Sequence, residues 1–285
     1  MHSQRFIDYS KIYTEGTVEK LKTLKADTFL KLKIALPPLA EQEKIVEILS
    51  TQDKLIELYQ RKIDELQKLK KIYLSKMFPQ KGKSVPEWRF PQFTDVWEQR
   101  KLGDMSESYS GGTPTVGVKE YYGGKIPFIR SAEINSDFTE LFITEDGLNN
   151  SSARLVYKGD ILYALYGATS GEVGRARLNG AINQAILAIK PYDGYDAEYI
   201  SQWLRKSKQN ITETYLQGGQ GNLSGTIVKD LLIQFPPLSE QQQIGAFFKQ
   251  FDNLITLHQR KLEEIKKQKK ALMQLLLTGI VRVAK

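Results

Sequence analysis

The chain has 285 residues, a formal net charge of +8, two histidines and no cysteine. The lack of cysteine excludes disulfides, a thiolate nucleophile and cysteine-ligated zinc. No apolar run approaches the roughly 20 residues that span a bilayer, and the first residues lack the apolar core of a secretory signal, so we expect a cytoplasmic protein with no membrane partner.

The first 35 residues resemble the end of a domain whose front is missing. The run Thr28–Ile34 leads into a proline pair just as Ile227–Ile233 leads into a second one. We therefore expect residues 1–35 to be the remnant of a first globular domain.

A repeated segment organises the rest of the chain. Leu36-Pro-Pro-Leu-Ala-Glu-Gln recurs as Phe235-Pro-Pro-Leu-Ser-Glu-Gln, and the two copies agree at 17 of 43 positions without a gap. Proline lacks an N–H and restricts its predecessor, so each helix should begin after its proline pair. The duplication predicts two long helices within residues 36–83 and 235–285, each roughly 57 Å long at 1.5 Å per residue.

Each copy repeats apolar residues at alternating intervals of four and three, the pattern of a coiled-coil seam. The seam residues that we expect to pack are Ile45, Leu49, Ile56, Ile63, Leu66, Phe248, Phe251, Ile255, Leu262 and Ile265. The alternative is that two independent amphipathic helices pack on separate cores.

Charge predicts the direction of pairing. Residues 60–83 and 259–285 each carry a net +6, whereas the helix starts at 39–59 and 238–258 are weakly acidic. Antiparallel pairing places each basic end against an acidic start, so it is favoured even after screening. It also brings Lys269 near Gln52, a polar pair suited to fixing register.

Residues 84–234 have a different character. Short β-type runs separated by glycine, at 125–130, 160–166 and 185–190, predict strands, and Ala197–Gln209 predicts a helix. We expect an α+β domain of residues 84–234, beside an antiparallel coiled coil. The net charge of this block is about −3, so composition alone does not indicate DNA binding here.

The order of these motifs resembles a known family. Pro37–Gln42 and Pro236–Gln241, each leading into a long helix, flank a domain containing Tyr109–Pro114, Tyr122–Pro127 and Gly167–Gly174. This arrangement is similar to the specificity (S) subunits of type I restriction–modification systems, in a truncated, half form. The resemblance implies that 84–234 is a target-recognition domain, that 1–35 is the remnant of another, and that both helices are the conserved ones.

The resemblance also implies partners. They are double-stranded DNA, modification (M, methyltransferase) subunits, restriction (R) subunits and, because only one recognition domain is complete, a second copy as a homodimer. The resemblance implies that the complex recognises a bipartite DNA target. S-adenosylmethionine, ATP and Mg²⁺ would bind the partner subunits, so we expect no cofactor and no metal on this chain.

No catalytic constellation is evident in the sequence. His2 is terminal, His258 falls on the helix seam, and Gly171–Gly174 lacks the Lys-Ser/Thr of a P-loop. No methyltransferase-type Asn/Asp-Pro-Pro-Tyr/Phe tetrad occurs. We therefore expect a non-catalytic subunit that directs chemistry performed by others.

Glycine-containing loops with polar, basic and aromatic residues are the candidates for reading DNA, because amide and guanidinium groups match base edges. The candidate DNA-binding residues are Ser110, Thr113, Lys119, Tyr121, Arg130, Tyr166, Thr169, Ser170, Arg175, Gln217, Gln220 and Asn222. The alternative at each position is an ordinary turn in which glycine supplies a positive φ.

Two other functions remain open from the sequence. A coiled-coil adaptor whose domain binds protein would suit the slightly acidic central block. An autonomous transcription regulator is disfavoured because no helix-turn-helix is evident.

Overall fold

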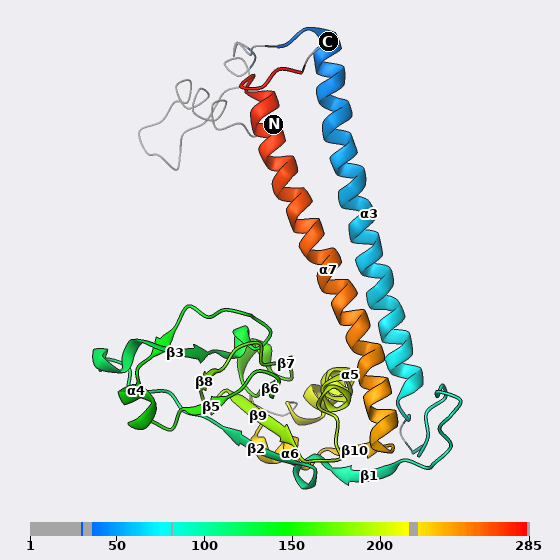
Figure 1. The fold of residues 1–285 in the computed structure, drawn as a ribbon, viewed down its shortest axis with the longest axis vertical. Helices are drawn as coiled ribbons and strands as arrows, with labels where there is room; N and C mark the ends of the chain where they lie inside the picture. The colour runs from blue at the N-terminus through cyan, green and yellow to red at the C-terminus, as the bar shows by residue number, and fades with distance from the viewer. Residues whose placement is uncertain (1–29, 31–35, 81, 217–221, 284–285) are drawn as a thin grey trace. The chain divides into compact units, whose positions relative to one another are not determined.

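Two long helices and three small sheets make up the computed structural model, which describes Leu30 and residues 36–80, 82–216 and 222–283 (Figure 1). The expected domain remnant at 1–35 lies outside the described residues, apart from Leu30. The chain forms two compact units, Met1–Leu66 with Asn253–Lys285, and Gln67–Asp252.

The helices are α3, Leu39–Met77, and α7, Leu238–Leu277. Both begin just after the proline pairs, as the sequence predicts. Of the expected seam residues, Ile45, Ile63, Phe248, Leu262 and Ile265 are buried, and the other five are half-buried. The alternating apolar pattern therefore identifies the faces of α3 and α7 that are shielded from solvent.

In the first unit, specific polar contacts join the two helices. Lys269 donates a hydrogen bond to Asp53, and Arg282 forms two hydrogen bonds with Glu41, at 2.7 and 2.5 Å. The expected partner of Lys269 was Gln52, but Lys269 bonds to the neighbouring residue Asp53. The Oε1 atom of Gln52 is buried without a hydrogen-bond partner.

The second unit is α+β. Its first four-stranded sheet is antiparallel in the order β2 (Ser106–Ser110), β9 (Ile186–Pro191), β6 (Ile161–Ala164), β7 (Val173–Arg175). The second has the order β4 (Phe142–Ile143), β3 (Tyr122–Ile129), β8 (Gly180–Ile182), β5 (Arg154–Val156), with β3 and β8 parallel. A third pairs β1 (Glu98–Lys101) with β10 (Leu232–Phe235).

Short helices complete this unit: α4 (Glu145–Asn149), α5 (Ala197–Tyr215) and α6 (Gly225–Lys229), with 3₁₀ turns at Leu102–Asp104, Lys119–Tyr121, Ser131–Glu133 and Gly167–Thr169. The three expected strands are present as β3, β6 and β9. The expected helix is present as α5 and extends to Tyr215. The expected limits of the recognition domain, 84 and 234, stay a prediction.

The core of the second unit has three parts. Apolar side chains including Tyr109, Leu162 and Ile182 fill the space between the two four-stranded sheets. A larger aromatic cluster, including Phe78, Tyr199 and Phe248, packs where α5 and the ends of α3 and α7 meet. A small cluster around Phe128 and Ile143 lies next to α4. In the part of the chain that the structure describes, no helix has a stretch long and apolar enough to cross a bilayer.

Candidate nucleic-acid interface

Three loops meet at one end of the sheet β2-β9-β6-β7. Ser110 pairs with Leu187, and Ala164 pairs with Ile186, so the residues just beyond these pairs share one edge. Gly111 N–H donates to Asn183 O at 3.2 Å, and Leu165 N–H donates to Ala185 O at 2.8 Å. We call this region, formed by residues 110–113, 165–170 and 183–185, the loop end.

The glycine pair after β2 makes this close approach possible. A Cβ built on Gly111 would lie 1.8 Å from the carbonyl oxygen of Ile182, and one on Gly112 would lie 2.6 Å from the Cβ of Ser152. No side chain fits such distances, so both glycines are needed for the chain to pass against β8 and β5.

Thr113 and Gln184 present polar side chains to solvent at the loop end. The Thr113 hydroxyl donates to Gln184 Oε1 at 2.9 Å, and both residues are exposed. Thr113 was predicted from the sequence and Gln184 was not. The signal for Gln184 was its place between two apolar runs that become β8 and β9, where a turn is required.

Arg154 adds a positive charge beside these residues. It pairs with Ile182 across β5 and β8, immediately before Asn183. Its guanidinium carbon lies 3.7 Å from the centre of the Tyr109 ring, a cation–π geometry, and its side chain is 51% exposed. Glu107 lies 3.8 Å away. The ring orients the guanidinium while leaving N–H groups free for another acceptor. Sequence reasoning missed Arg154 because β5 is too short to give a strand pattern.

The other candidates at the loop end have mixed roles. Tyr166 is half-buried and forms an isolated bridge with Asn222, which is exposed. Thr169 donates to Tyr166 O at 3.3 Å, and buried Ser170 donates to Leu165 O at 3.2 Å. These two hydroxyls therefore stabilise the turn, whereas Asn222 offers its amide to solvent. Ser110, in β2, is half-buried.

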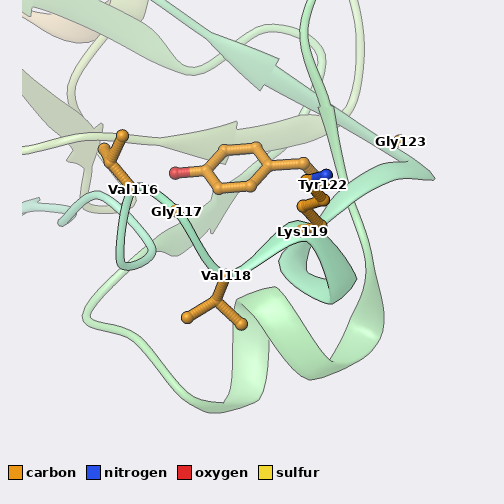
Figure 2. A pocket seen from close by; sticks show the side chains of 6 residues that line it. All are labelled: Val116, Gly117, Val118, Lys119, Tyr122 and Gly123. Atoms are coloured by element: carbon orange, nitrogen blue, oxygen red, sulfur yellow. The ribbon is translucent and has the colours of Figure 1, made fainter.

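Lys119 and Tyr121 lie on the 3₁₀ turn before β3. Lys119 also lines a shallow pocket (Figure 2). The Tyr122 ring points across this pocket toward Val116, and its hydroxyl donates to Pro114 O at 2.7 Å. Apolar side chains form much of the lining, and Val116 is 83% exposed. The contacts hold the loop that follows Thr113 against β3.

Arg130 follows β3 and is held by carboxylates. Its Nη2 atom lies 2.5 Å from Glu133 and 3.4 Å from Glu140, and its side chain is 47% exposed. Hydrogen bonding to Glu133 raises the pKa of Arg130. A DNA contact by Arg130 therefore competes with two acidic neighbours.

Arg175 faces helix α5 instead of the loop end. Its Nη1 atom lies 3.9 Å from Glu198 Oε2, while Nε and Nη1 are buried without a hydrogen-bond partner. Burial lowers the pKa of Arg175. The remaining candidates, Gln217 and Gln220, lie outside the described residues. DNA contact at each of the twelve positions stays a prediction.

No cluster of three or more potential metal-binding side chains occurs among the residues that the structure describes.

Comparison with known proteins identifies related chains. A family model described as "Type I restriction modification DNA specificity domain" matches residues 8–68 and 94–267. The chain is 31% identical over 262 residues to the "Putative type I restriction enzyme MjaX specificity subunit" of Methanocaldococcus jannaschii, covering 88% of this chain and 60% of that protein. It is 29% identical over 289 residues to the "Type I restriction enzyme MjaVIII specificity subunit" of the same organism, covering 96% and 68%.

The fold has solved counterparts. The crystal structure of a type I restriction–modification system S subunit from M. genitalium matches 93% of this chain and 68% of that chain, with a TM-score of 0.65 and 16% identity. At this identity the likeness shows the fold alone. The chain spans less than two thirds of the length of the MjaX relative.

Proposed function

The chain belongs to the type I restriction modification DNA specificity family, and on that premise we propose that it reads a DNA sequence and directs modification and restriction subunits to it. The observation that carries this proposal is the loop end. Thr113, Gln184, Arg154 and Asn222 come from separate segments and present exposed polar or cationic groups. We propose that the protein acts in the cytoplasm, because its proposed target is DNA.

The chemistry of these groups matches double-stranded DNA. A glutamine or asparagine amide pairs with adenine by one donated and one accepted hydrogen bond, and arginine pairs with guanine or with phosphate. Oxygen Oε1 of Gln184 accepts from Thr113, which orients the amide and leaves a second lone pair on that oxygen. A held amide loses less side-chain entropy on binding than a free one.

The two helices support an antiparallel coiled coil. In the first unit, Asp53 contacts Lys269 of α7, and Glu41 contacts Arg282, which follows the end of α7. Positions that come earlier in α3 therefore meet positions that come later in the C-terminal segment. Seam residues Ile63, Leu262 and Ile265 are buried there. We include this pairing in the proposal because it gives the recognition domain a rigid support.

Modification and restriction subunits are the proposed protein partners, and they would bring the methyl donor, ATP and Mg²⁺. These partners would also supply positive charge for the DNA phosphates. The central block is slightly acidic, and non-specific DNA affinity grows with the number of phosphates neutralised. Leu58, Leu254 and Leu257 are 38%, 44% and 60% exposed on the helices, which is apolar surface available for a partner.

Loss of the loop-end side chains should weaken DNA binding. Gln184→Ala or Arg154→Ala is expected to reduce the affinity for the cognate duplex by about 1–3 kcal/mol, the usual value of one base contact. The measurement is fluorescence anisotropy of the complex with its modification subunit, titrated onto cognate and scrambled duplexes. Gln99→Ala and Arg100→Ala are matched controls, because both residues are exposed on β1 in a different sheet.

If the loop-end variants bind the cognate duplex as tightly as the β1 controls, the loop end is not the reading surface. If the unmodified complex binds cognate and scrambled duplexes with equal affinity, the proposal that the chain recognises a DNA sequence is wrong.

A homodimer of this chain would read a symmetric target. Two copies related by a two-fold axis supply two identical domains, and closed two-fold symmetry is the commonest solution for self-association. The expected recognised motif is an interrupted palindrome, and sedimentation velocity should give a mass corresponding to two copies. A motif with two unlike halves would mean that a different S chain supplies the second domain, and a complex with a single copy would exclude the homodimer.

A further inference from the structure

One carboxylate joins three helices in the second unit. Oxygen Oδ1 of Asp252, on α7, accepts from Lys70 Nζ of α3 at 2.6 Å. Its other oxygen, Oδ2, accepts from Gln202 Nε2 at 2.7 Å and from Arg205 Nη1 at 3.1 Å, both on α5. Asp252 therefore ties the ends of both long helices to α5, which contacts β7 of the sheet β2-β9-β6-β7. We call this sheet the recognition sheet.

The same network continues into the sheet. Arg205 Nε donates to the backbone oxygen of Val173 in β7 at 3.3 Å. Glu198 lies 3.7 Å from Arg205 and 3.9 Å from Arg175, which is also in β7. The contacts thus run from α3 through Asp252 and α5 to β7, the strand that ends at Arg175.

Burial makes these contacts strongly selective for one geometry. The side chains of Lys70, Glu198 and Arg205 are 13%, 16% and 26% exposed. Burial lowers the pKa of Lys70, against the opposing effect of Asp252. A poorly solvated charge is costly unless its partner stays within contact.

The neighbouring aromatic cluster does not impose the same precision. Apolar burial is non-directional and tolerates small sliding or rotation of one element on another. Hydrogen bonds weaken steeply when distance or angle changes. The apolar cluster therefore stabilises the packing of the elements, while the charged network fixes their relative orientation.

We propose that Asp252 is a positioning residue that fixes the orientation of the recognition sheet relative to the adjoining helix ends, and thereby sets the number of unread base pairs between the two half-sites. This inference rests on the proposed function. Asp252 itself contacts no DNA in this account.

The chain offers a closely matched control. Asp53 on α3 also bonds a lysine of the other long helix, Lys269, but among the described residues it makes no hydrogen bond to α5. Asp53→Asn and Asp252→Asn therefore remove the same kind of cross-helix ion pair. Only Asp252→Asn also weakens the tie to the recognition domain.

The test uses the complete complex with its modification subunit and S-adenosylmethionine. Duplexes carry the cognate half-sites with the native spacer or with one base pair added or removed, and the initial methylation rate is measured on each. The methylation rate on the native spacer, divided by the rate on an altered spacer, should fall at least about tenfold in Asp252→Asn. A displacement of reacting groups by about 1 Å lowers the rate of an alignment-dependent step by up to about 100-fold. Asp53→Asn should keep the ratio of the unmodified protein, and Asp252→Glu should restore part of it.

A second variant covers the case in which Asp252→Asn fails to fold. Gln202→Met keeps the volume of a buried side chain and removes its bond to Asp252, while the Lys70 pair remains. It should also relax the spacer preference. If the folded variants at 252 or 202 keep full spacer preference, the inference is wrong. If the unmodified complex methylates without sequence preference, the proposed function fails instead.

Discussion

Arg89→Ala is expected to lower the free energy of unfolding by about 3–5 kcal/mol, the usual cost of breaking a buried pair from one side. Arg89 Nε and Nη2 each bond a different oxygen of Glu240 at 2.7 Å. The Glu240 side chain is fully buried and that of Arg89 is 14% exposed. The substitution would leave a buried carboxylate at the start of α7 without a cation.

Chemical denaturation followed by far-ultraviolet circular dichroism measures this loss. Adding Glu240→Gln to Arg89→Ala should recover part of the stability, because a neutral amide costs less to bury than a carboxylate. Arg100→Ala is the matched control, since Arg100 pairs with Glu98 on the surface, where ion pairs contribute little. Equal effects of Arg89→Ala and Arg100→Ala would contradict the buried-pair interpretation.

Phe248→Ala should cost a similar amount, about 3–5 kcal/mol, through lost burial and the cavity that remains. Phe248 has no exposed surface and stacks on Phe78 with ring centres 6.0 Å apart. Phe78 in turn lies 5.2 Å from Tyr199 of α5. The cavity would open where α3, α5 and α7 pack together.

Thermal unfolding should show the loss as a lower Tm. Phe138→Ala provides the same chemical change at a side chain that is 67% exposed, where substitutions are usually within about 0.5 kcal/mol. Phe248→Leu should be intermediate, because it fills part of the space. A Tm for Phe248→Ala equal to that of Phe138→Ala would show that the cluster does not hold the helices to α5.

The sequence predicts the helices better than the sheets. Proline pairs and an apolar spacing of four and three residues are local signals, and each occurs in both copies of the repeat. The sequence therefore assigns Ile45, Ile63, Leu262 and Ile265 to a buried seam. The parallel pairing of β3 with β8 depends on contacts about 53 residues apart, which no local pattern encodes. The bond of Lys269 with Asp53 instead of Gln52 is a one-residue difference that the heptad pattern does not resolve.

The candidate site was predicted in part. Glycine-rich segments led to Thr113 and Asn222, which the structure places at or beside the loop end. They did not lead to Gln184 and Arg154, whose positions follow from the pairing of β5, β8 and β9. Arg175 was chosen for its charge, and only the three-dimensional structure reveals Glu198 facing it.

Methylome sequencing tests the central claim most directly. Cells would carry this chain together with its cognate modification subunit, either unmodified or with Gln184→Ala and Arg154→Ala combined. We predict methylation of one discrete, interrupted motif by the unmodified chain, and loss or alteration of that motif in the loop-end variant while the complex still assembles. The same motif at the same occupancy in both strains would contradict DNA reading by the loop end.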